Sequence, residues 1–347
     1  MAAADSNKAN EVWTIKRALD WTQGYLASKG DDNPRLSAQW LIGEACGLSR
    51  MQLYTSFDTQ LTRPQLDVLH GYVARRASGE PLQYITGEAA FRHIVVKVAP
   101  GVLIPRPETE VLVSEALALL PAAPRPRVSD DEFIAALAAE APSVEDVSDD
   151  DAYADVRRAI QAARDEVDSR VQEQTILVAD ICTGTGCIAC SIASEHPRTH
   201  VIATDISAEA LSLAAVNVVN LGLAERVDVL QSDLGAAVDP ALLGSFDLVV
   251  SNPPYIPTAV LGELPAEVSQ FEPALALDGG EDGLDLYRRL LDWCKQALRP
   301  GGHCAFELHE TTLDQAKELA EQAGFENVSI KRDLADRPRI LIAKLPE

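Results

Sequence analysis

The stretch TILVADICTGTGCIACSIASEH, residues 175–196, contains a strand, a glycine-rich loop and a helix in succession. Its first part is an apolar run with the length of a buried strand, and its last part has helical spacing. Gly184 and Gly186 lie between the two, where the lack of a side chain lets the backbone turn tightly and approach a ligand. The helix that follows offers free N–H groups at its first turn. This order predicts a ligand-binding loop at the start of a βαβ unit.

Two acidic residues follow this loop at the ends of the next apolar runs. Gly184-x-Gly186-x-x-Ala189 satisfies the dinucleotide fingerprint, and Asp205 ends the run HVIATDI about 20 residues later, where an acid accepts hydrogen bonds from ribose hydroxyls. The third run, RVDVLQSD, ends in Asp233, which could accept from an adenine amino group or cap a loop. The pattern indicates a nucleoside cofactor without saying which one.

The alternation of apolar runs and helical segments continues through the rest of the chain. FDLVVSN is followed by the helical segment GLDLYRRLLDWCKQAL, the run GGHCAFELH, a further helical segment and two closing strand candidates, NVSIKRDL and RILIAKL. Such runs predict an α/β fold, a doubly wound and mostly parallel sheet with helices on both faces, over residues 175–347. Because a short loop separates the last two strands, we expect one antiparallel strand at the edge.

The fourth apolar run ends in SNPPY, residues 251–255, at the sheet edge where open α/β folds bind ligands. The Asn252 side chain both donates and accepts, whereas Pro253 and Pro254 fix φ and donate nothing, so nearby carbonyls are held rigidly as acceptors. Tyr255 adds a flat aromatic face. These residues predict a pocket for a planar group that carries an NH₂, with the Asn252 oxygen and the Pro253 carbonyl gripping both hydrogens.

This pocket suggests a chemistry. An amide or aromatic amine nitrogen is a poor nucleophile because its lone pair is delocalised, so holding its hydrogens and aiming the lone pair at an electrophile supplies orientation. The electrophile would be a methyl group on a sulfonium carried by loop 182–186. A nicotinamide enzyme does not need this motif, and none of the six histidines suggests a hydride-transfer acid. The alternative is a proline-rich turn that only ends a strand.

Three regions precede this domain. Residues 1–83 have helical spacing with Asn-Pro and Thr-Arg-Pro starts, which predicts a small helical bundle. Residues 84–120 hold β-branched runs broken by Pro-Gly and then a helical segment, which predicts a hairpin linker and a helix. Residues 121–174 contain 14 acidic residues against six arginines, which favours a mobile acidic surface insertion. A docking arm for a partner is the alternative for that insertion.

Composition excludes several classes of protein. The net charge of −23 disfavours a surface that tracks nucleic-acid phosphates, so we expect no direct nucleic-acid binding. No apolar run is long enough to span a membrane, and no signal peptide is evident, so we expect a cytoplasmic protein. Cys187 and Cys190 form a CxxC, but no second pair accompanies them. We therefore expect free thiols and no metal, with a metal or redox site as the alternative.

The motifs together resemble one enzyme family, the protein-(glutamine-N5) methyltransferases that modify peptide chain release factors. The resemblance extends over nearly the whole chain outside residues 121–174. Asn-Pro-Pro-Tyr alone is also found in N6-adenine methyltransferases, so its combination with the other motifs is what makes the match specific. Those motifs are GEPLQYITG (79–87), VLIPRPETE (102–110), DICTGTGCIA (180–189), SNPPYI (251–256), FEP (271–273) and DGGEDGLD (278–285).

The resemblance implies a class I methyltransferase fold, S-adenosylmethionine as methyl donor and the glutamine of a Gly-Gly-Gln loop in release factors as acceptor. It implies that the helical domain helps to hold the release factor. The implied cofactor residues are Cys182, Thr183, Gly184, Thr185, Gly186, Asp205, Asp233, Leu234 and Asn252. The implied catalytic residues are Asn252, Pro253 and Tyr255, and these together with Pro254 form the substrate grip.

Two positions depart from the family pattern. Cys182 stands where the family often has glycine, and Leu234 stands where some members have an aromatic residue over the adenine. Two other functions are alternatives. An N6-adenine methyltransferase of DNA or RNA is disfavoured by the acidic charge and the lack of a nucleic-acid module. A catalytically silent cofactor-binding partner of translation factors is disfavoured by the intact Gly184, Asp205 and Asn252.

Overall fold

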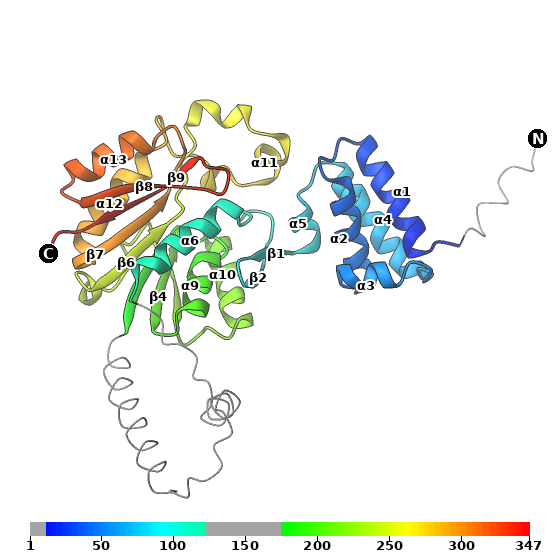
Figure 1. Ribbon diagram of the computed structural model, residues 1–347, viewed down its shortest axis with the longest axis horizontal. Helices are drawn as coiled ribbons and strands as arrows, with labels where there is room; N and C mark the ends of the chain where they lie inside the picture. Colours follow the sequence, from blue (N-terminus) through cyan, green and yellow to red (C-terminus); the bar gives the residue numbers. More distant parts are fainter. Residues whose placement is uncertain (1–11, 122–174) are drawn as a thin grey trace, which may run out of the picture.

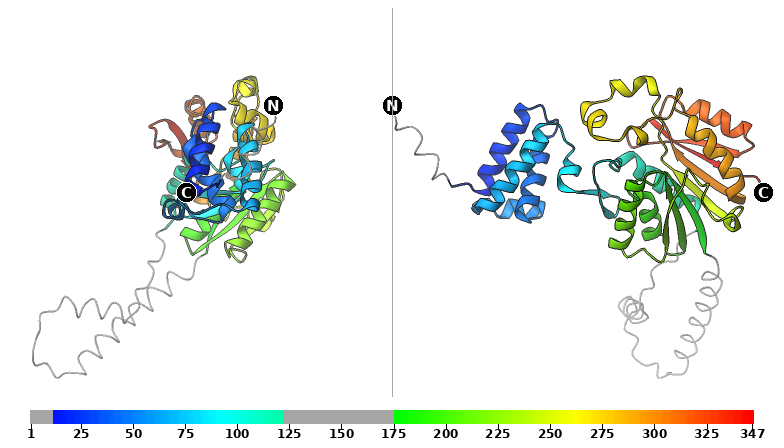
Figure 2. Two further views of the ribbon diagram at one scale, coloured as in Figure 1. Left: turned by 90° about the vertical axis from the view of Figure 1, so that its right-hand side faces the viewer. Right: turned by 180° about the vertical axis from the view of Figure 1, so that it is seen from behind.

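The computed structural model describes residues 12–121 and 175–347, and these form a helical bundle, a linker and a sheet domain (Figure 1). The insertion expected at 121–174 falls almost wholly outside the described residues. In Figures 1 and 2 the bundle stands to one side of the sheet domain, and helix α5 and the β1–β2 hairpin lie between them.

The N-terminal bundle confirms the helices that the sequence predicts. Thr14, Ser49 and Thr62 cap helix starts with their hydroxyls, and the last two form capping boxes with a glutamine three residues later. A separate apolar core that includes Ile15, Leu41 and Leu53 fills the bundle. The helices are α1 (Ile15–Ser28), α2 (Pro34–Cys46), α3 (Arg50–Thr55), α4 (Arg63–Ala77) and α5 (Leu82–Thr86).

The predicted hairpin is present, but its turn is not at the Pro-Gly pair. β1 (Glu88–Phe91) pairs with β2 (Ile94–Lys97), so the turn is at residues 92–93. Arg92 takes a left-handed φ of 51° there, and its guanidinium binds the Glu195 carboxylate with N···O distances of 2.6 and 2.7 Å. Pro100-Gly101 instead turns the chain toward α6 (Pro107–Leu119). An ion pair with a distant residue, which the local sequence does not reveal, therefore accompanies the turn.

The second part of the chain forms a seven-stranded sheet in the order β5-β4-β3-β6-β7-β9-β8. The fold class is confirmed, since β5, β4, β3, β6 and β7 are all parallel. The antiparallel strand is β9, but it lies between β7 and β8 rather than at the edge, because β8 pairs on its outer side. The strands are β3 (Ile176–Ile181), β4 (Thr199–Asp205), β5 (Val227–Gln231), β6 (Phe246–Ser251), β7 (Leu298–Glu307), β8 (Glu326–Arg332) and β9 (Pro338–Lys344).

Helices cover both faces of this sheet, as the apolar strands predict. In β6, Leu248 and Val250 pack into one core, which also contains residues of α6, α9 (Cys187–Glu195) and α10 (Ala208–Asn220). Val249 points to the other core, together with residues of α12 (Asp285–Ala297) and α13 (Leu313–Gln322). A short helix, α11 (Ala266–Phe271), and three 3₁₀ turns, η2 (Pro240–Leu242), η3 (Thr258–Glu263) and η4 (Ala274–Ala276), complete the described part of this domain.

Asn217 on α10 joins the hairpin to the glycine loop. Its side chain is 1% exposed, and its Oδ1 accepts from the backbone N–H of Lys97 at 2.7 Å. Its Nδ2 donates to the carbonyl of Lys97 at 3.0 Å and to that of Thr185 at 2.9 Å. One buried amide therefore bonds to the backbone of hairpin strand β2 and also to the backbone of the glycine loop.

We expect Asn217→Ala to lower the free energy of unfolding by about 1–3 kcal/mol, because it removes three hydrogen bonds and leaves a buried carbonyl without its partner. Urea unfolding followed by circular dichroism measures the change. Val219→Ala, on the same helix but at a side chain that is 67% exposed, is the matched control and should stay within about 0.5 kcal/mol. Equal stability of the two variants would contradict the role of Asn217.

Candidate functional site

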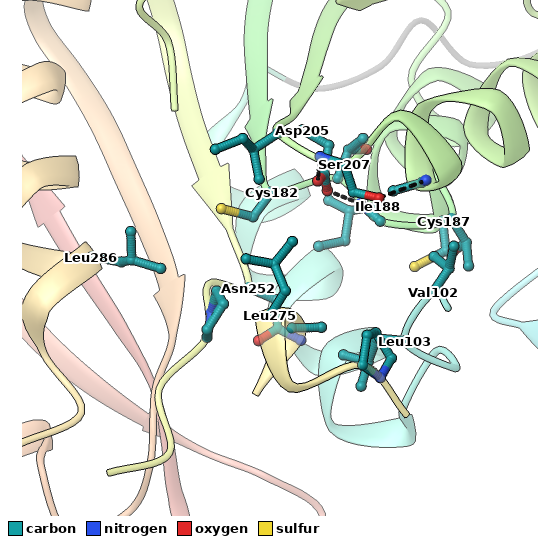
Figure 3. A pocket seen from close by; sticks show the side chains of 18 of the residues that line it. Val102, Leu103, Cys182, Cys187, Ile188, Asp205, Ser207, Asn252, Leu275 and Leu286 are labelled. Atoms are coloured by element: carbon teal, nitrogen blue, oxygen red, sulfur yellow. Dashed lines mark hydrogen bonds between the residues drawn. The ribbon is translucent and has the colours of Figure 1, made fainter. Parts of the chain in front are cut away.

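A pocket of about 310 Å³ opens at the carboxyl ends of β3, β4, β5 and β6. The strand order reverses between β3 and β6, and this is the place where open α/β sheets bind ligands. Figure 3 shows Leu286 of α12 on one side and Val102 and Leu103 of the linker on the other, with Asn252 and Leu275 between them. Segments that are far apart in sequence thus share one cavity.

The glycine loop forms one wall of this pocket. Cys182, Thr183, Gly184 and Thr185 line it, while Gly186 is the N-cap of α9 and does not. Cys182, Gly184 and Gly186 have φ values of 62°, 57° and 79°, which is the left-handed region. A Cβ on Gly186 would lie 3.2 Å from the Cβ of Ala214, so this glycine is also needed for packing. At position 182 the left-handed conformation is thus compatible with the small side chain of cysteine.

Asp180, the last acidic residue before the loop, supports it from within the sheet. Its carboxylate is 0% exposed and accepts from the Thr183 hydroxyl at 2.6 Å and from the Ala189 N–H at 3.1 Å. Burial raises the pKa of Asp180 to about 7. Sequence reasoning did not assign it a role, although an acid within the run ILVADI was a visible signal.

Asp205 lies at the end of β4, in the position expected for a ribose-binding acid (Figure 3). Its Oδ2 accepts from the Gly184 N–H at 2.9 Å, and its Oδ1 accepts from the Ser207 N–H at 2.9 Å. Burial raises the pKa of Asp205, although these N–H groups stabilise the ionised form. The carboxylate holds the glycine loop and still lines the pocket, so it can accept further hydrogen bonds from a ligand.

Asp233 and Leu234 follow β5 and also line the pocket. Both carboxylate oxygens of Asp233 accept from Nη2 of Arg289, at 2.8 and 2.7 Å, and Arg289 lines the pocket as well. Leu234 has a left-handed φ of 50° and is 8% exposed, and its carbonyl accepts from the Thr204 hydroxyl. Leu234, the predicted aliphatic contact, thus lies at the pocket, whereas Arg289 was not predicted.

Asn252 and Pro254, directly after β6, line the pocket opposite the linker. The Asn252 Nδ2 donates to the Thr109 hydroxyl oxygen at 3.1 Å. Pro253 is buried and Tyr255 is half-buried, and neither lines the pocket. The Tyr255 hydroxyl donates to Oε1 of Glu307 at 3.2 Å. The roles of Pro253 and Tyr255 toward a substrate therefore stay predictions.

Thr109, which lines the pocket beside Asn252, and Glu307, which does not line it, were not predicted. The Thr109 hydroxyl donates to Oε2 of Glu307 at 2.7 Å, and these side chains are 2% and 1% exposed. The available signals were the PETE sequence, whose threonine received no role, and the charged residue in the apolar run HCAFELH. Sequence alone did not place the two together, because α6 and β7 lie almost 200 residues apart.

The linker before α6 forms the wall opposite Asn252, and it is tied at both ends. The Tyr84 hydroxyl donates to the carbonyl of Val102 at 2.7 Å. Nη2 of Arg106 lies 2.5 Å from Oε2 of Glu272, whose side chain is 1% exposed. Burial raises the pKa of Glu272, and Arg106 opposes this shift. The ion pair joins the linker to the segment that follows β6.

The described residues 12–121 and 175–347 contain no group of three His, Cys, Asp or Glu side chains that could hold a metal ion. Cys187 and Cys190 are buried free thiols on α9, and burial raises the pKa of each to about 12. In the same part of the chain, no helix combines the length and the apolar character that a membrane crossing requires.

Comparison with known proteins gives a consistent result. Residues 17–87 match the family PrmC N-terminal domain, and residues 165–261 match the family Methyltransferase small domain. A release factor glutamine methyltransferase of Geobacter sulfurreducens is 38% identical over 91% of this chain and 91% of its own length. Enzymes of the same name from Rhodopirellula baltica and Moorella thermoacetica are 36% and 37% identical, each over 95% of this chain and over 95% and 98% of their own lengths.

We expect Asp205→Ala to weaken S-adenosylmethionine binding by about 10- to 100-fold, because each hydrogen bond from a ribose hydroxyl to a carboxylate contributes about 1.5–3 kcal/mol. Isothermal titration calorimetry measures the affinity. Asp228→Ala is the control, since Asp228 lies on β5, pairs with His200 and does not line the pocket. An unchanged affinity of the Asp205 variant would remove this residue from the cofactor site.

Proposed function

Because the chain belongs to the family of release factor glutamine methyltransferases, we infer that it transfers the methyl group of S-adenosylmethionine to the side-chain amide nitrogen of a glutamine. The acceptor is the glutamine of the Gly-Gly-Gln loop in peptide chain release factors. S-adenosylmethionine, when bound, supplies the methyl group on a positively charged sulfur. The residues of this chain have to bind the two reactants, orient the amide nitrogen and keep competing water away.

The position and orientation of Asn252 is the observation that carries this proposal. Its NH₂ is committed to Thr109, so its Oδ1 is left to accept a hydrogen bond in the pocket. A second acceptor, the Pro253 carbonyl, would take the other hydrogen of the substrate NH₂. With both hydrogens held, the nitrogen lone pair points in one direction, and positive charge that develops on nitrogen during transfer is stabilised by the two oxygens.

The pocket fits S-adenosylmethionine. The Asp205 carboxylate would accept from the ribose hydroxyls, and Gly184 keeps the loop open beside it. Asp233 is held by Arg289 in a position to accept from the adenine amino group, and Leu234 and Leu286 offer apolar contact for the ring. Cys182 to Gly186 would surround the methionine part. We assign these residues to the cofactor on this basis.

We assign recognition of the release factor to the helical residues 1–83 and the chemistry to residues 175–347, with 84–120 as the connection. Two contacts support a helical domain that acts with the pocket. Nη1 of Arg76 lies 3.0 Å from Oε1 of Glu267 on α11, and Gly79 packs near Phe271. An acidic protein with this arrangement suits a protein substrate better than DNA or RNA. Since release factors act in translation, we place the enzyme in the cytoplasm.

We expect Asn252→Ala to reduce methyl transfer by at least about 10²–10³-fold while cofactor affinity stays nearly unchanged, because the variant loses the acceptor that orients the substrate amide. Purified release factor is incubated with enzyme and labelled S-adenosylmethionine, and mass spectrometry locates a gain of one methylene mass on the loop glutamine. Calorimetry checks the cofactor affinity.

Asn220→Ala, at an exposed position on α10, is the control and should keep full activity. If Asn252→Ala transfers methyl groups at the normal rate, the role of Asn252 is wrong. If the wild-type enzyme leaves the glutamine unmodified and instead methylates adenine in an oligonucleotide, the substrate class is wrong.

A further inference from the structure

Asn252 is bonded to a row of buried polar side chains that begins with Thr109 at the pocket wall and leads to Glu307, which does not line the pocket. Asn252 follows β6, Thr109 lies in the first turn of α6, and Glu307 ends β7. The row runs from the Asn252 Nδ2 to the Thr109 Oγ1 over 3.1 Å and from there to the Glu307 Oε2 over 2.7 Å. The other carboxylate oxygen accepts from the Tyr255 hydroxyl.

The direction of these hydrogen bonds follows from counting hydrogens. A threonine hydroxyl has one hydrogen, and an ionised carboxylate has none, so the bond between Thr109 and Glu307 uses the only hydrogen of Thr109. The Thr109 oxygen is then left with lone pairs alone toward Asn252. It can bind the NH₂ of the Asn252 amide but not its oxygen. The ionised Glu307 thus determines which end of the Asn252 amide faces the pocket.

We propose that Glu307 and Thr109 are positioning residues, which fix the amide of Asn252 with its oxygen toward the substrate nitrogen. This inference rests on the proposed function, since the orientation matters only if Asn252 grips a substrate NH₂. A flipped amide would present its own NH₂ to the substrate NH₂, and two donors would then face each other. The carboxylate acts through Thr109 and does not line the pocket.

The surroundings of Glu307 make its charge sensitive to pH. Burial raises its pKa from the ordinary 4.5 to about 7, while the Thr109 and Tyr255 hydroxyls and the positive charge of Arg339 on β9 oppose the shift. Glu108 on α6 adds to it. His309, near Tyr255, has a pKa lowered by burial and by Arg339. A protonated Glu307 can donate to Thr109. The Thr109 hydroxyl hydrogen is then free to bind the side-chain oxygen of Asn252, which would turn the Asn252 NH₂ toward the pocket.

Ionisation of Glu307 favours the correct orientation of Asn252 but lowers the stability of the folded protein. A carboxyl whose pKa is raised in the folded protein contributes stability that is complete below pH 4.5 and is lost as the pH rises through about 7. At pH 8 the folded protein therefore carries an unfavourable buried charge. Glu307→Gln removes this charge and keeps the shape, so the variant should be at least as stable as the wild type at pH 8.

The test compares kcat, KM and stability in a small set of variants with a release factor as substrate. We expect Glu307→Gln to lower kcat by about 10- to 100-fold at pH 8, with S-adenosylmethionine affinity and thermal stability kept. A glutamine whose oxygen accepts from Tyr255 turns its NH₂ toward Thr109, and the Thr109 hydrogen is then free to bind the Asn252 oxygen. Thr109→Val should lose as much, whereas Thr109→Ser, which keeps the hydroxyl, should retain most of the rate. In the wild type, kcat should rise with pH through about 7, and this rise should be absent in Glu307→Gln.

Glu326→Gln, at an exposed position on β8, is the control and should behave as the wild type. The inference is overturned if Glu307→Gln works at the wild-type rate, or if Thr109→Ser is as slow as Thr109→Val. It is also overturned if the losses in Glu307→Gln are matched by a loss of stability, which would indicate a structural role. The pair at position 109 keeps the test decisive if the Glu307 variant does not fold. A wild-type enzyme that leaves the release factor unmethylated would contradict the proposed function instead.

Discussion

The parallel pairing of β3 with β6 is the constraint on which the site depends. Ile181 is opposite Ser251 in this pair, and the Ser251 hydroxyl donates to the Ile181 carbonyl at 2.5 Å. The register therefore places the start of the glycine loop, Cys182, beside Asn252. A shift by one residue would turn every side chain of β6 to the opposite face and remove the juxtaposition. The glycine loop and Asn252 are adjacent because this register aligns the ends of the two strands.

The glycine loop and Asn252 are each supported by the same arrangement, in which a threonine hydroxyl donates a hydrogen bond to a buried carboxylate. Thr183 in the glycine loop donates to Asp180, and Thr109 beside Asn252 donates to Glu307. Burial raises the pKa of each acid to about 7. A buried carboxyl destabilises a fold unless several hydrogen bonds compensate it, so apolar residues would be the more stable choice for packing alone. The two acids are better explained by the loops whose conformation they fix.

Whether a site residue can be predicted from the sequence depends on where it lies in the fold. Gly184, Asp205 and Asn252 stand at the ends of apolar strands, and strand order brings such ends together, so the sequence predicted their places. Thr109 and Glu307 meet only because α6 packs across β7, a tertiary contact with no local pattern. The hairpin turn likewise lies at Arg92, which pairs with Glu195 about a hundred residues away, and not at the Pro-Gly signal. Residues whose positions follow from topology are thus predictable from the sequence, whereas residues brought together by packing are not.

The remaining wall of the pocket links the chemistry to the helical domain. Leu275 and Pro273, which follow α11, line the pocket, and this segment is held by two ion pairs from outside the sheet domain. Arg106 of the linker binds Glu272, and Arg76 of α4 binds both Asp31 of the bundle and Glu267 of α11. The Asp31–Arg76 pair within the bundle is nearly buried and is screened less by salt than a surface pair, whereas the Glu267 side chain on α11 is 44% exposed. The helical bundle and the segment that lines the pocket are therefore joined by an ion pair on this side.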